Sequence, residues 1–193
     1  MFIIPIGILV VIVGYGVLTY NKFVTLKTRI KASIQEIGNQ LKRQVNLIPN
    51  LVDSVKGYMS HEKEIFQSIT EARKAILTAT EKNDPQLMLD AEAKMRATLG
   101  EFKVLMENTP EIKAIEAVTK LMDELRDTSD KIMYSRRVLI DLSADYNVMV
   151  VAIPSNFVAM LFKFKAEKGL VTPQEGEHLE VSIEETKNPE VKL

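Results

Sequence analysis

The sequence contains no cysteine, so neither a disulfide framework nor a zinc site with thiolate ligands is possible. It also has no excess of charge of either sign, because its formal net charge at pH 7 is −1. Without a strongly basic surface a protein does not attract nucleic acid through a general electrostatic field, and we predict no nucleic-acid partner. Apolar residues make up 46% of the chain, which is enough for a substantial core and excludes disorder throughout.

Histidine is scarce as well, and the motifs of common catalytic sites are missing. His61-Glu62 begins like the zinc-binding motif HExxH, but Ile65 stands where the second histidine would bind the metal, and the other histidine is the distant His178. The chain does not have the two Glu-x-x-His pairs of a two-metal site, nor a P-loop, GxSxG or dinucleotide-binding glycine pattern. We therefore predict that the protein is not an enzyme and needs no cofactor or metal. A hydrolase centred on His61 and Glu62 is the alternative.

The long apolar run of the sequence is FIIPIGILVVIVGYGVLT at residues 2–19, which carries no charge. As a helix rising ~1.5 Å per residue it is about 27 Å long, just enough to cross a lipid bilayer. A cleaved signal peptide is the alternative, but no Lys or Arg precedes the run and no small-x-small cleavage pattern follows it. We predict a transmembrane anchor at residues 1–20. Its residues include Phe2, Ile8, Val11 and Tyr15, with Tyr20 as an interfacial aromatic.

The basic residues nearest the anchor all follow it: Lys22, Lys27, Arg29 and Lys31. Positive residues flanking a membrane helix favour the cytoplasmic side. We therefore predict a single-pass protein with its amino terminus outside and the bulk of the chain in the cytoplasm.

From residue 23 onward, apolar residues recur every three or four positions in four successive series, which is the spacing of one face of an α-helix. No turn signal separates the first series from the anchor. The second series, from Leu51 to Ala79, is spaced strictly 4-3-4-3, and the fourth helix is expected from Pro110 to about Val150. Short turns between four helices favour up-down packing. The sequence therefore predicts an all-α fold in which the transmembrane helix continues into an antiparallel four-helix bundle over residues 21–150.

Prolines indicate where these helices begin, because proline is tolerated in the first helical turn, where its missing N–H has no partner within the helix. Asp84-Pro85 and Thr109-Pro110 each predict an N-cap residue followed by the first helical residue.

Pro49, with Asn46 as N-cap, predicts the start of the second helix by the same rule. Gly57 then falls inside that helix, where glycine costs ~1 kcal/mol relative to alanine. We expect another helix to approach closely at this glycine.

One charged residue interrupts the apolar seam of the second helix. Glu62 occupies a seam position, where a carboxylate loses hydration worth several kcal/mol unless a cation and hydrogen bonds replace the water. We expect Glu62 to meet Arg136 or Arg73 in a polar core layer, with Ser129 or Ser143 nearby. Such a pair usually fixes helix register. A ligand or partner site is the alternative.

Residues 151–165 combine a proline-serine break with a short apolar segment that ends in alternating Phe and Lys. This composition is typical of an interfacial element whose lysines reach toward the lipid headgroups, so we predict a membrane-proximal segment. A segment that folds onto the end of the bundle as a cap is equally compatible. The residues expected to contact the membrane are Phe157, Leu161, Phe162, Lys163, Phe164 and Lys165.

Residues 166–193 are rich in Glu, Lys, Pro and Gly and contain no aromatic residue, so we predict an extended or disordered tail. The string HLEVSIE within it is compatible with strand addition to a partner's sheet.

The string NQLKRQVNLIPNLVDSVKGYMSHEKE at residues 39–64, followed by EAR at residues 71–73, resembles the signature of the LemA family. The resemblance extends to YN at residues 20–21, RR at 136–137, DYN at 145–147 and PSN at 154–156, and covers roughly residues 1–165. It implies a bacterial-type, inner-membrane-anchored α-helical protein whose short amino terminus faces outward. Related members have been linked to membrane shaping in magnetic organelles, and the family implies no particular reaction.

Together these patterns favour a structural scaffold that self-assembles as a homo-oligomer at the inner membrane surface. The helices carry apolar residues beyond one seam, such as Val52, Met59 and Phe66, which are candidates for contacts between copies. The alternative is an adaptor that presents its tail or the membrane-proximal segment to an unknown protein partner, such as a membrane enzyme or protease.

Overall fold

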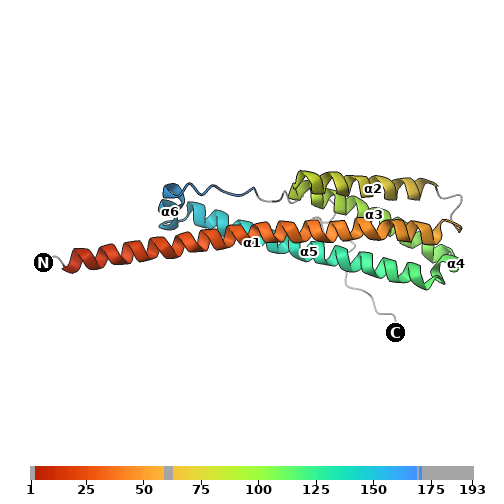
Figure 1. Cartoon of the computed structure of the whole chain (residues 1–193), viewed down its shortest axis with the longest axis horizontal. Helices are drawn as coiled ribbons and strands as arrows, with labels where there is room; N and C mark the ends of the chain where they lie inside the picture. Colours follow the sequence, from red (N-terminus) through yellow and green to blue (C-terminus); the bar gives the residue numbers. More distant parts are fainter. Residues whose placement is uncertain (1–2, 59–62, 169, 171–193) are drawn as a thin grey trace, which may run out of the picture.

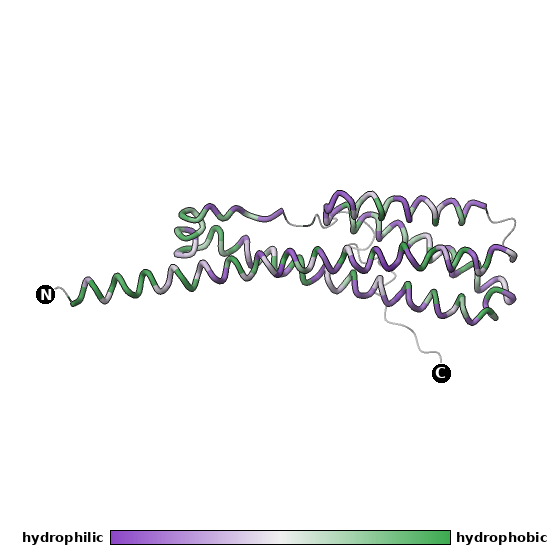
Figure 2. The backbone as a smooth tube through the Cα atoms, in the orientation of Figure 1, coloured by the Kyte–Doolittle hydropathy of each residue, from purple (hydrophilic) through white to green (hydrophobic). Residues whose placement is uncertain are grey.

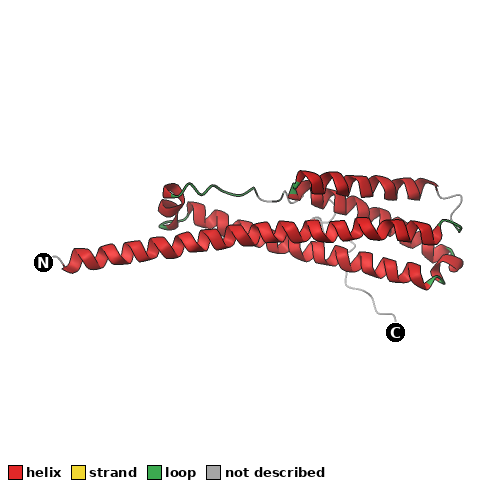
Figure 3. Ribbon diagram, viewed as in Figure 1, coloured by secondary structure: helices red, strands yellow, loops and turns green. Residues whose placement is uncertain are grey.

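The computed structural model describes residues 3–58, 63–168 and 170. Its regular structure in these ranges is entirely helical, without a strand (Figure 3). The helices are α1 (Ile3–Val55), α2 (Lys63–Lys82), α3 (Pro85–Asn108), α4 (Pro110–Lys113), α5 (Glu116–Val151) and α6 (Ser155–Leu161). The predicted all-α class is therefore confirmed.

Helix α1 is the longest element, with 53 residues, and it includes most of the predicted anchor. Among the described residues it is the one unbroken helix long and apolar enough to cross a membrane. Only 6% of its most apolar window is buried, whereas the core helix of a soluble protein would be mostly buried. Its apolar end projects beyond the other helices (Figures 1 and 2). Of the predicted anchor residues, Phe2 lies outside the described residues, whereas Ile8, Val11, Tyr15 and Tyr20 are exposed on α1.

Helix α5 runs back along α1 in the opposite direction (Figure 1). The Ser33 hydroxyl of α1 donates a hydrogen bond of 2.9 Å to the Ser135 carbonyl oxygen of α5. Ten residues further along α1, the Arg43 guanidinium contacts the Glu124 carboxylate at 3.3 Å. Partner numbers on α5 fall as those on α1 rise, which fixes the antiparallel register.

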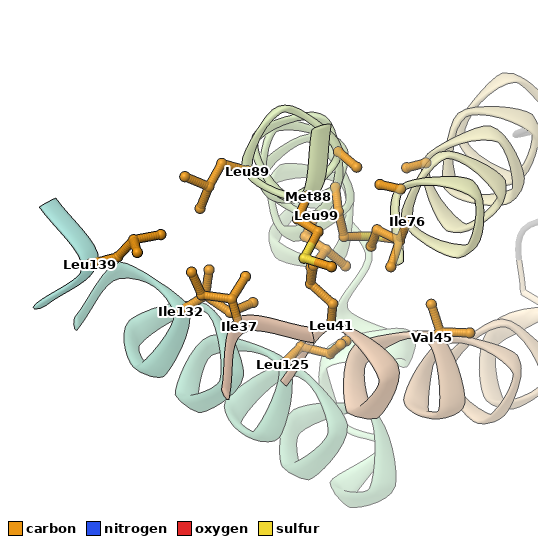
Figure 4. Close-up of a cluster of buried hydrophobic side chains, with 14 of the residues drawn as sticks. Ile37, Leu41, Val45, Ile76, Met88, Leu89, Leu99, Leu125, Ile132 and Leu139 are labelled. Carbon is orange, nitrogen blue, oxygen red and sulfur yellow. The ribbon is translucent and has the colours of Figure 1, made fainter. Parts of the chain in front are cut away.

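Helices α2 and α3 lie side by side, and both contact the second half of α1 (Figure 1). Figure 4 shows buried side chains from α1, α2, α3 and α5 converging on one core. The labelled members are Ile37, Leu41, Val45, Ile76, Met88, Leu89, Leu99, Leu125, Ile132 and Leu139. A groove of about 450 Å³ lies between α3 and α5, lined by residues that include Leu99, Met106, Met122 and Met133.

The predicted start of the second helix at Pro49 is wrong. Helix α1 continues through Pro49 to Val55, so Asn46 is not an N-cap. Proline inside a helix removes the hydrogen bond that its N–H would donate to the carbonyl four residues earlier, here that of Val45. Arg73 of α2 replaces that donor, because its Nε donates to the Val45 carbonyl oxygen at 3.3 Å. A contact between two helices therefore keeps the proline within α1.

The expected helix contact at Gly57 is also wrong. Gly57 lies in the turn that follows α1, and a Cβ added there would meet nothing within 4 Å. We call α1 from Phe23 onward together with α2, α3, α4 and α5 the helical body. Among its described glycines, Gly38 on α1 is the one with a close neighbour, the Met88 methyl group at 3.8 Å from a Cβ built there.

The prediction at Asp84-Pro85 is confirmed, because the Asp84 carboxylate accepts hydrogen bonds from the Gln86 and Leu87 N–H groups at 2.9 and 3.2 Å. Thr109 also stands at an N-cap before Pro110, but without a side-chain cap bond.

The predicted helix from Pro110 to Val150 is divided. It breaks at Ala114 and Ile115, where the extended backbone of Ile115 (ψ 102°) separates α4 from α5.

Candidate membrane-proximal site

Four aromatic side chains join the end of the chain's described part to α1. Tyr20 contacts Phe162 and Phe164, with ring centroids 4.7 and 5.6 Å apart, and Phe23 stacks on Phe164 at 4.7 Å. Aromatic pairs in this range add favourable energy to that of the area they bury. We call Tyr20, Phe23, Phe162 and Phe164 the aromatic cluster.

Lys163 explains why both phenylalanines reach α1. Its φ is 58°, the left-handed conformation that commonly ends a helix. The Lys163 N–H bonds the Met160 carbonyl at 3.3 Å and the Phe164 N–H bonds the Ala159 carbonyl at 2.9 Å. These two bonds form a Schellman motif, which stops α6 and turns the chain back. The alternating Phe-Lys pattern therefore belongs to a tight turn, with exposed Lys163 at its corner.

Polar contacts fasten the same segment to α5. The Asn147 side chain donates to the Glu167 carbonyl oxygen at 3.0 Å and accepts from the Glu167 N–H at 2.9 Å. Between α5 and α6, the Ser155 hydroxyl contacts the carbonyl oxygens of Met149 and Ala152 at 2.7 and 3.0 Å. Carbonyls near a helix end often lack a partner within the helix, and Ser155 supplies one to the Met149 carbonyl.

Helix α6 turns away from α5 by 88° and packs beside the apolar part of α1. A groove of about 860 Å³ lies between them. Its lining comes from residues 11–20 of α1 and residues 154–162, and it is almost entirely apolar. Large apolar side chains around it are open to solvent: Phe157 is 61% exposed and Leu161 is 74% exposed.

The structure brings the predicted membrane-proximal residues together but divides them between two environments. Phe157, Leu161 and Phe162 lie on or next to the exposed apolar surface, although Phe162 also contacts Tyr20. Phe164 packs against the core, so it belongs to the capping interpretation instead. Lys163 and Lys165 are exposed.

The predicted polar layer around Glu62 cannot be compared, because Glu62 lies outside the described residues. Arg73, the second expected partner of Glu62, instead donates to the Val45 carbonyl beside Pro49, as described above. A buried carboxylate that the sequence analysis missed lies elsewhere, at Glu92 of α3, which is 3% exposed. Its position was readable, because Met88, Glu92, Met95 and Leu99 repeat at the same 4-3-4 spacing as a bundle seam.

Glu92 contributes to a polar layer with Gln44 of α1 and Ser129 of α5. The Gln44 amide donates to the Ser129 hydroxyl at 3.0 Å, and an Arg96 nitrogen lies 3.5 Å from the Glu92 carboxylate. Burial raises the pKa of Glu92, and the charge of Arg96, the Ser129 hydroxyl and the charge of Arg136 oppose that rise. The predicted participants Arg136 and Ser129 therefore do lie near a buried carboxylate.

No group of three His, Asp or Glu side chains that could hold a metal occurs within the described ranges. His61 and His178 lie outside those ranges, so the hydrolase hypothesis stays a hypothesis.

Comparison with known proteins places this chain in a family. The sequence model of the LemA family matches residues 33–186. This chain belongs to the LemA family. The match extends into the tail, beyond the region of resemblance noted in the sequence, and it does not include residues 1–32.

Among curated LemA relatives, the magnetosome protein MamQ of Magnetospirillum gryphiswaldense is 26% identical over 170 residues, which cover 76% of this chain and 62% of that protein. The magnetosome proteins MamQ 1 and MamQ 2 of Paramagnetospirillum magneticum are each 24% identical over the same extents. The chain therefore spans about 62% of the length of the curated relatives it matches.

The short motifs of the LemA resemblance now have structural roles. In DYN, Tyr146 is fully buried beside Phe23 with ring centroids 5.6 Å apart, and Asn147 holds Glu167. In PSN, Ser155 caps the end of α5. Tyr20 of YN belongs to the aromatic cluster. All three motifs serve the junction between the apolar end of α1 and the helical body.

Proposed function

We propose that this protein is a single-pass inner-membrane protein that acts as a structural scaffold on the cytoplasmic membrane surface. The observation that carries the proposal is the continuity of α1, which runs without a break from the candidate membrane span into the packed helices. An unbroken helix fixes the direction of the helical body relative to the membrane, because it leaves no hinge between them.

The proposed architecture is an antiparallel four-helix bundle of α1, α2, α3 and α5. Its support is the shared core of these helices and the antiparallel register of α1 and α5. A groove of about 450 Å³ remains between α3 and α5 of this bundle. The similarity to magnetosome proteins of the same family supports a role at a membrane, and we propose neither catalysis nor a cofactor.

Self-assembly needs an apolar surface that faces outward. The residues that the sequence suggested for it, Val52, Met59 and Phe66, do not provide an exposed surface among the described residues. Val52 and Phe66 pack against the core, and Met59 lies outside the described residues. Exposed apolar side chains of the helical body instead include Tyr134 of α5, 71% exposed, and Val104 of α3, 58% exposed. We propose that contacts between copies form through these exposed apolar side chains of α3 and α5.

The test is the mass of the full-length protein in lipid nanodiscs and mild detergent, measured by mass photometry with negative-stain images of the same sample. A defined multimer is expected, and Val104→Glu with Tyr134→Glu should reduce it to the monomer. Leu77→Glu, which places a carboxylate at an exposed apolar position on α2, is the matched control and should keep the multimer. A monomeric parent would overturn the scaffold.

Orientation is tested separately, because the chain has no cysteine and a single introduced one gives a label without background. In intact cells an impermeant maleimide should label Ile3→Cys and not Tyr134→Cys. The reverse pattern would place the helical body outside.

An adaptor is the second candidate function. The methionine-lined groove between α3 and α5 favours it, because methionine side chains adapt to varied apolar partners. Deleting residues 171–193 is the sharpest test of a role for the tail, since the deletion spares Glu167 and Leu170, which contact the helical body. A scaffold keeps its assembly after this deletion, whereas an adaptor that uses its tail loses partner capture.

A further inference from the structure

Residues 146–162 contain no Asp, Glu, Lys, Arg or His, although they lie in a chain with 26% charged residues. Charged Asp145 and Lys163 stand at the two ends of this stretch. It comprises the end of α5, a sharp bend and α6. Uncharged stretches of this kind are a feature of chain that lies in hydrocarbon.

The aromatic cluster places both ends of the stretch at the level where α1 leaves the candidate span. Tyr20 is the last aromatic before the charged part of α1, and it contacts Phe162 at 4.7 Å. Tyr146, at the other end, contacts Phe23 at 5.6 Å. Exposed Lys22 and Lys163 lie next to these contacts in the chain. Three passages of the chain therefore meet in one plane, with mostly hydrophilic residues on one side of it and hydrophobic residues on the other (Figure 2).

Helix α6 lies on the apolar side of this plane. Its groove partner is the stretch of α1 from Val11 to Tyr20. That stretch spans ~14 Å at ~1.5 Å per residue, about half of a ~30 Å hydrocarbon core. Because α6 bends 88° away from α5, and α5 is antiparallel to α1, α6 lies roughly across the direction of α1. This is the orientation of a short helix lying in one leaflet.

Several backbone polar groups of the bend between α5 and α6 have partners within the protein, as non-helical backbone in a membrane requires. The Ala152 and Asn156 N–H groups donate to the carbonyls of Val148 and Ala152, both at 2.8 Å. The Ser155 hydroxyl contacts the Ala152 carbonyl as well and also that of Met149, and Pro154 has no N–H to satisfy.

From this geometry we propose that residues 146–162 form a re-entrant element in the leaflet that faces the helical body, and that the groove between α6 and α1 holds one phospholipid acyl chain. The occupant is a lipid chain because the walls are apolar, one wall is part of the candidate span, and the groove is about one leaflet deep. Lys22 follows Tyr20 by two residues in the sequence, and Lys163 and Lys165 flank Phe164, which contacts Tyr20. At this level their charges meet lipid phosphates. Because the groove needs α1 to cross the membrane, we rest this inference on the function proposed above.

The first experiment uses the absence of tryptophan in the chain. Phe157→Trp reports on α6, Leu9→Trp on the anchor, and Tyr134→Trp on the helical body. Each variant is placed in bilayers of phosphatidylcholine and phosphatidylglycerol with brominated acyl chains. The bromines should quench Phe157→Trp and Leu9→Trp fluorescence but not that of Tyr134→Trp.

Its outcomes separate the two proposals. Quenching of Leu9→Trp without quenching of Phe157→Trp overturns the re-entrant element and leaves the anchor in place. If Leu9→Trp also escapes quenching, the membrane anchor is wrong as well. Leu161→Trp, on the same helix, repeats the measurement in case Phe157→Trp does not fold.

The second experiment fills the groove. Gly16 lines it, whereas Gly14 does not, and a Cβ at either position meets nothing within 4 Å. Native mass spectrometry of protein released from the same bilayers should show one retained phospholipid on the parent chain. Gly16→Leu should lose it and Gly14→Leu should keep it. Equal retention by the two variants, or no retention by the parent, overturns the acyl-chain site.

Discussion

At the scale of the residue, two buried polar groups have stabilities that depend on contacts between helices. The Glu92 carboxylate lies among α1, α3 and α5 with little access to water. The Val45 carbonyl accepts no hydrogen bond from position 49, because Pro49 has no N–H, and it accepts one from Arg73 instead. Each group gives a prediction for the stability of the full-length protein in mild detergent, with thermal unfolding followed by circular dichroism.

Glu92 should make the protein less stable as the pH rises. Burial raises its pKa in the folded state above the usual ~4.3, so the folded chain binds a proton more tightly than the unfolded chain. Stability contributed by this group therefore falls as the pH rises from about 4.3 through the raised folded-state pKa. Glu92→Gln should remove this dependence and gain up to ~1 kcal/mol at pH 8.

The matched control is Glu101→Gln, which removes a carboxylate from an exposed position of the same helix. If both variants change the pH profile of the melting temperature equally, Glu92 has no special role.

Arg73 and Pro49 should be energetically coupled. Arg73→Met leaves the Val45 carbonyl without a donor and should cost ~1–3 kcal/mol in the parent. In a Pro49→Ala background the backbone regains an N–H at position 49 that can bond to that carbonyl, so the cost of Arg73→Met should fall by at least ~1 kcal/mol. Arg137→Met removes an exposed arginine and serves as the control. Strictly additive effects of Pro49→Ala and Arg73→Met would contradict the replacement of one donor by the other.

At the scale of the secondary-structure element, the residues at helix ends decide where a helix starts and stops. Asp84 starts α3 by capping two N–H groups, and the Schellman motif at Lys163 ends α6. The first was predicted, since Asp before Pro is a local signal. The second was not predicted, because a lysine in the left-handed conformation leaves no pattern in composition or spacing, and the sequence allowed both a membrane contact and a cap on the bundle end.

Lys163→Gly should stabilise the turn after α6. A residue with a Cβ pays roughly 1 kcal/mol to adopt the left-handed conformation, and glycine does not. We expect a gain of about 1 kcal/mol in the free energy of unfolding, against no gain for Lys165→Gly, which makes the same change two residues away. Equal effects of the two substitutions would show that the turn does not carry this strain.

At the scale of the whole molecule, the segment after α6 joins the membrane-proximal end to the helical body. Phe164 stacks on Phe23, the Glu167 backbone is held by Asn147, and Lys27 lies 3.6 Å from the Glu167 carboxylate. These contacts tie residues far apart in the sequence into one junction, so the chain between α6 and the tail has a structural role that its composition does not reveal.

Two truncations should separate this segment from the tail. A chain ending after Leu170 should melt within about 0.5 kcal/mol of the parent, because its contacts with α1 and α5 remain. A chain ending after Leu161 should lose on the order of 3 kcal/mol, chiefly from the buried aromatic contacts of Phe164. Equal losses in the two truncations would mean that residues 171–193 also stabilise the helical body.

The sequence by itself determined the helical class, the apolar amino-terminal helix, the cap at Asp84 and membership of the LemA family. These depend on signals carried by neighbouring residues: apolar runs, helical periodicity, caps and short motifs. Tertiary structure alone decided that Pro49 stays inside α1, that Glu92 meets Ser129 of α5 and that Phe164 packs on Phe23. The reason is physical, because each outcome depends on a partner from another helix: Arg73 for the Val45 carbonyl, Ser129 for Glu92, and α1 for the turn at Lys163.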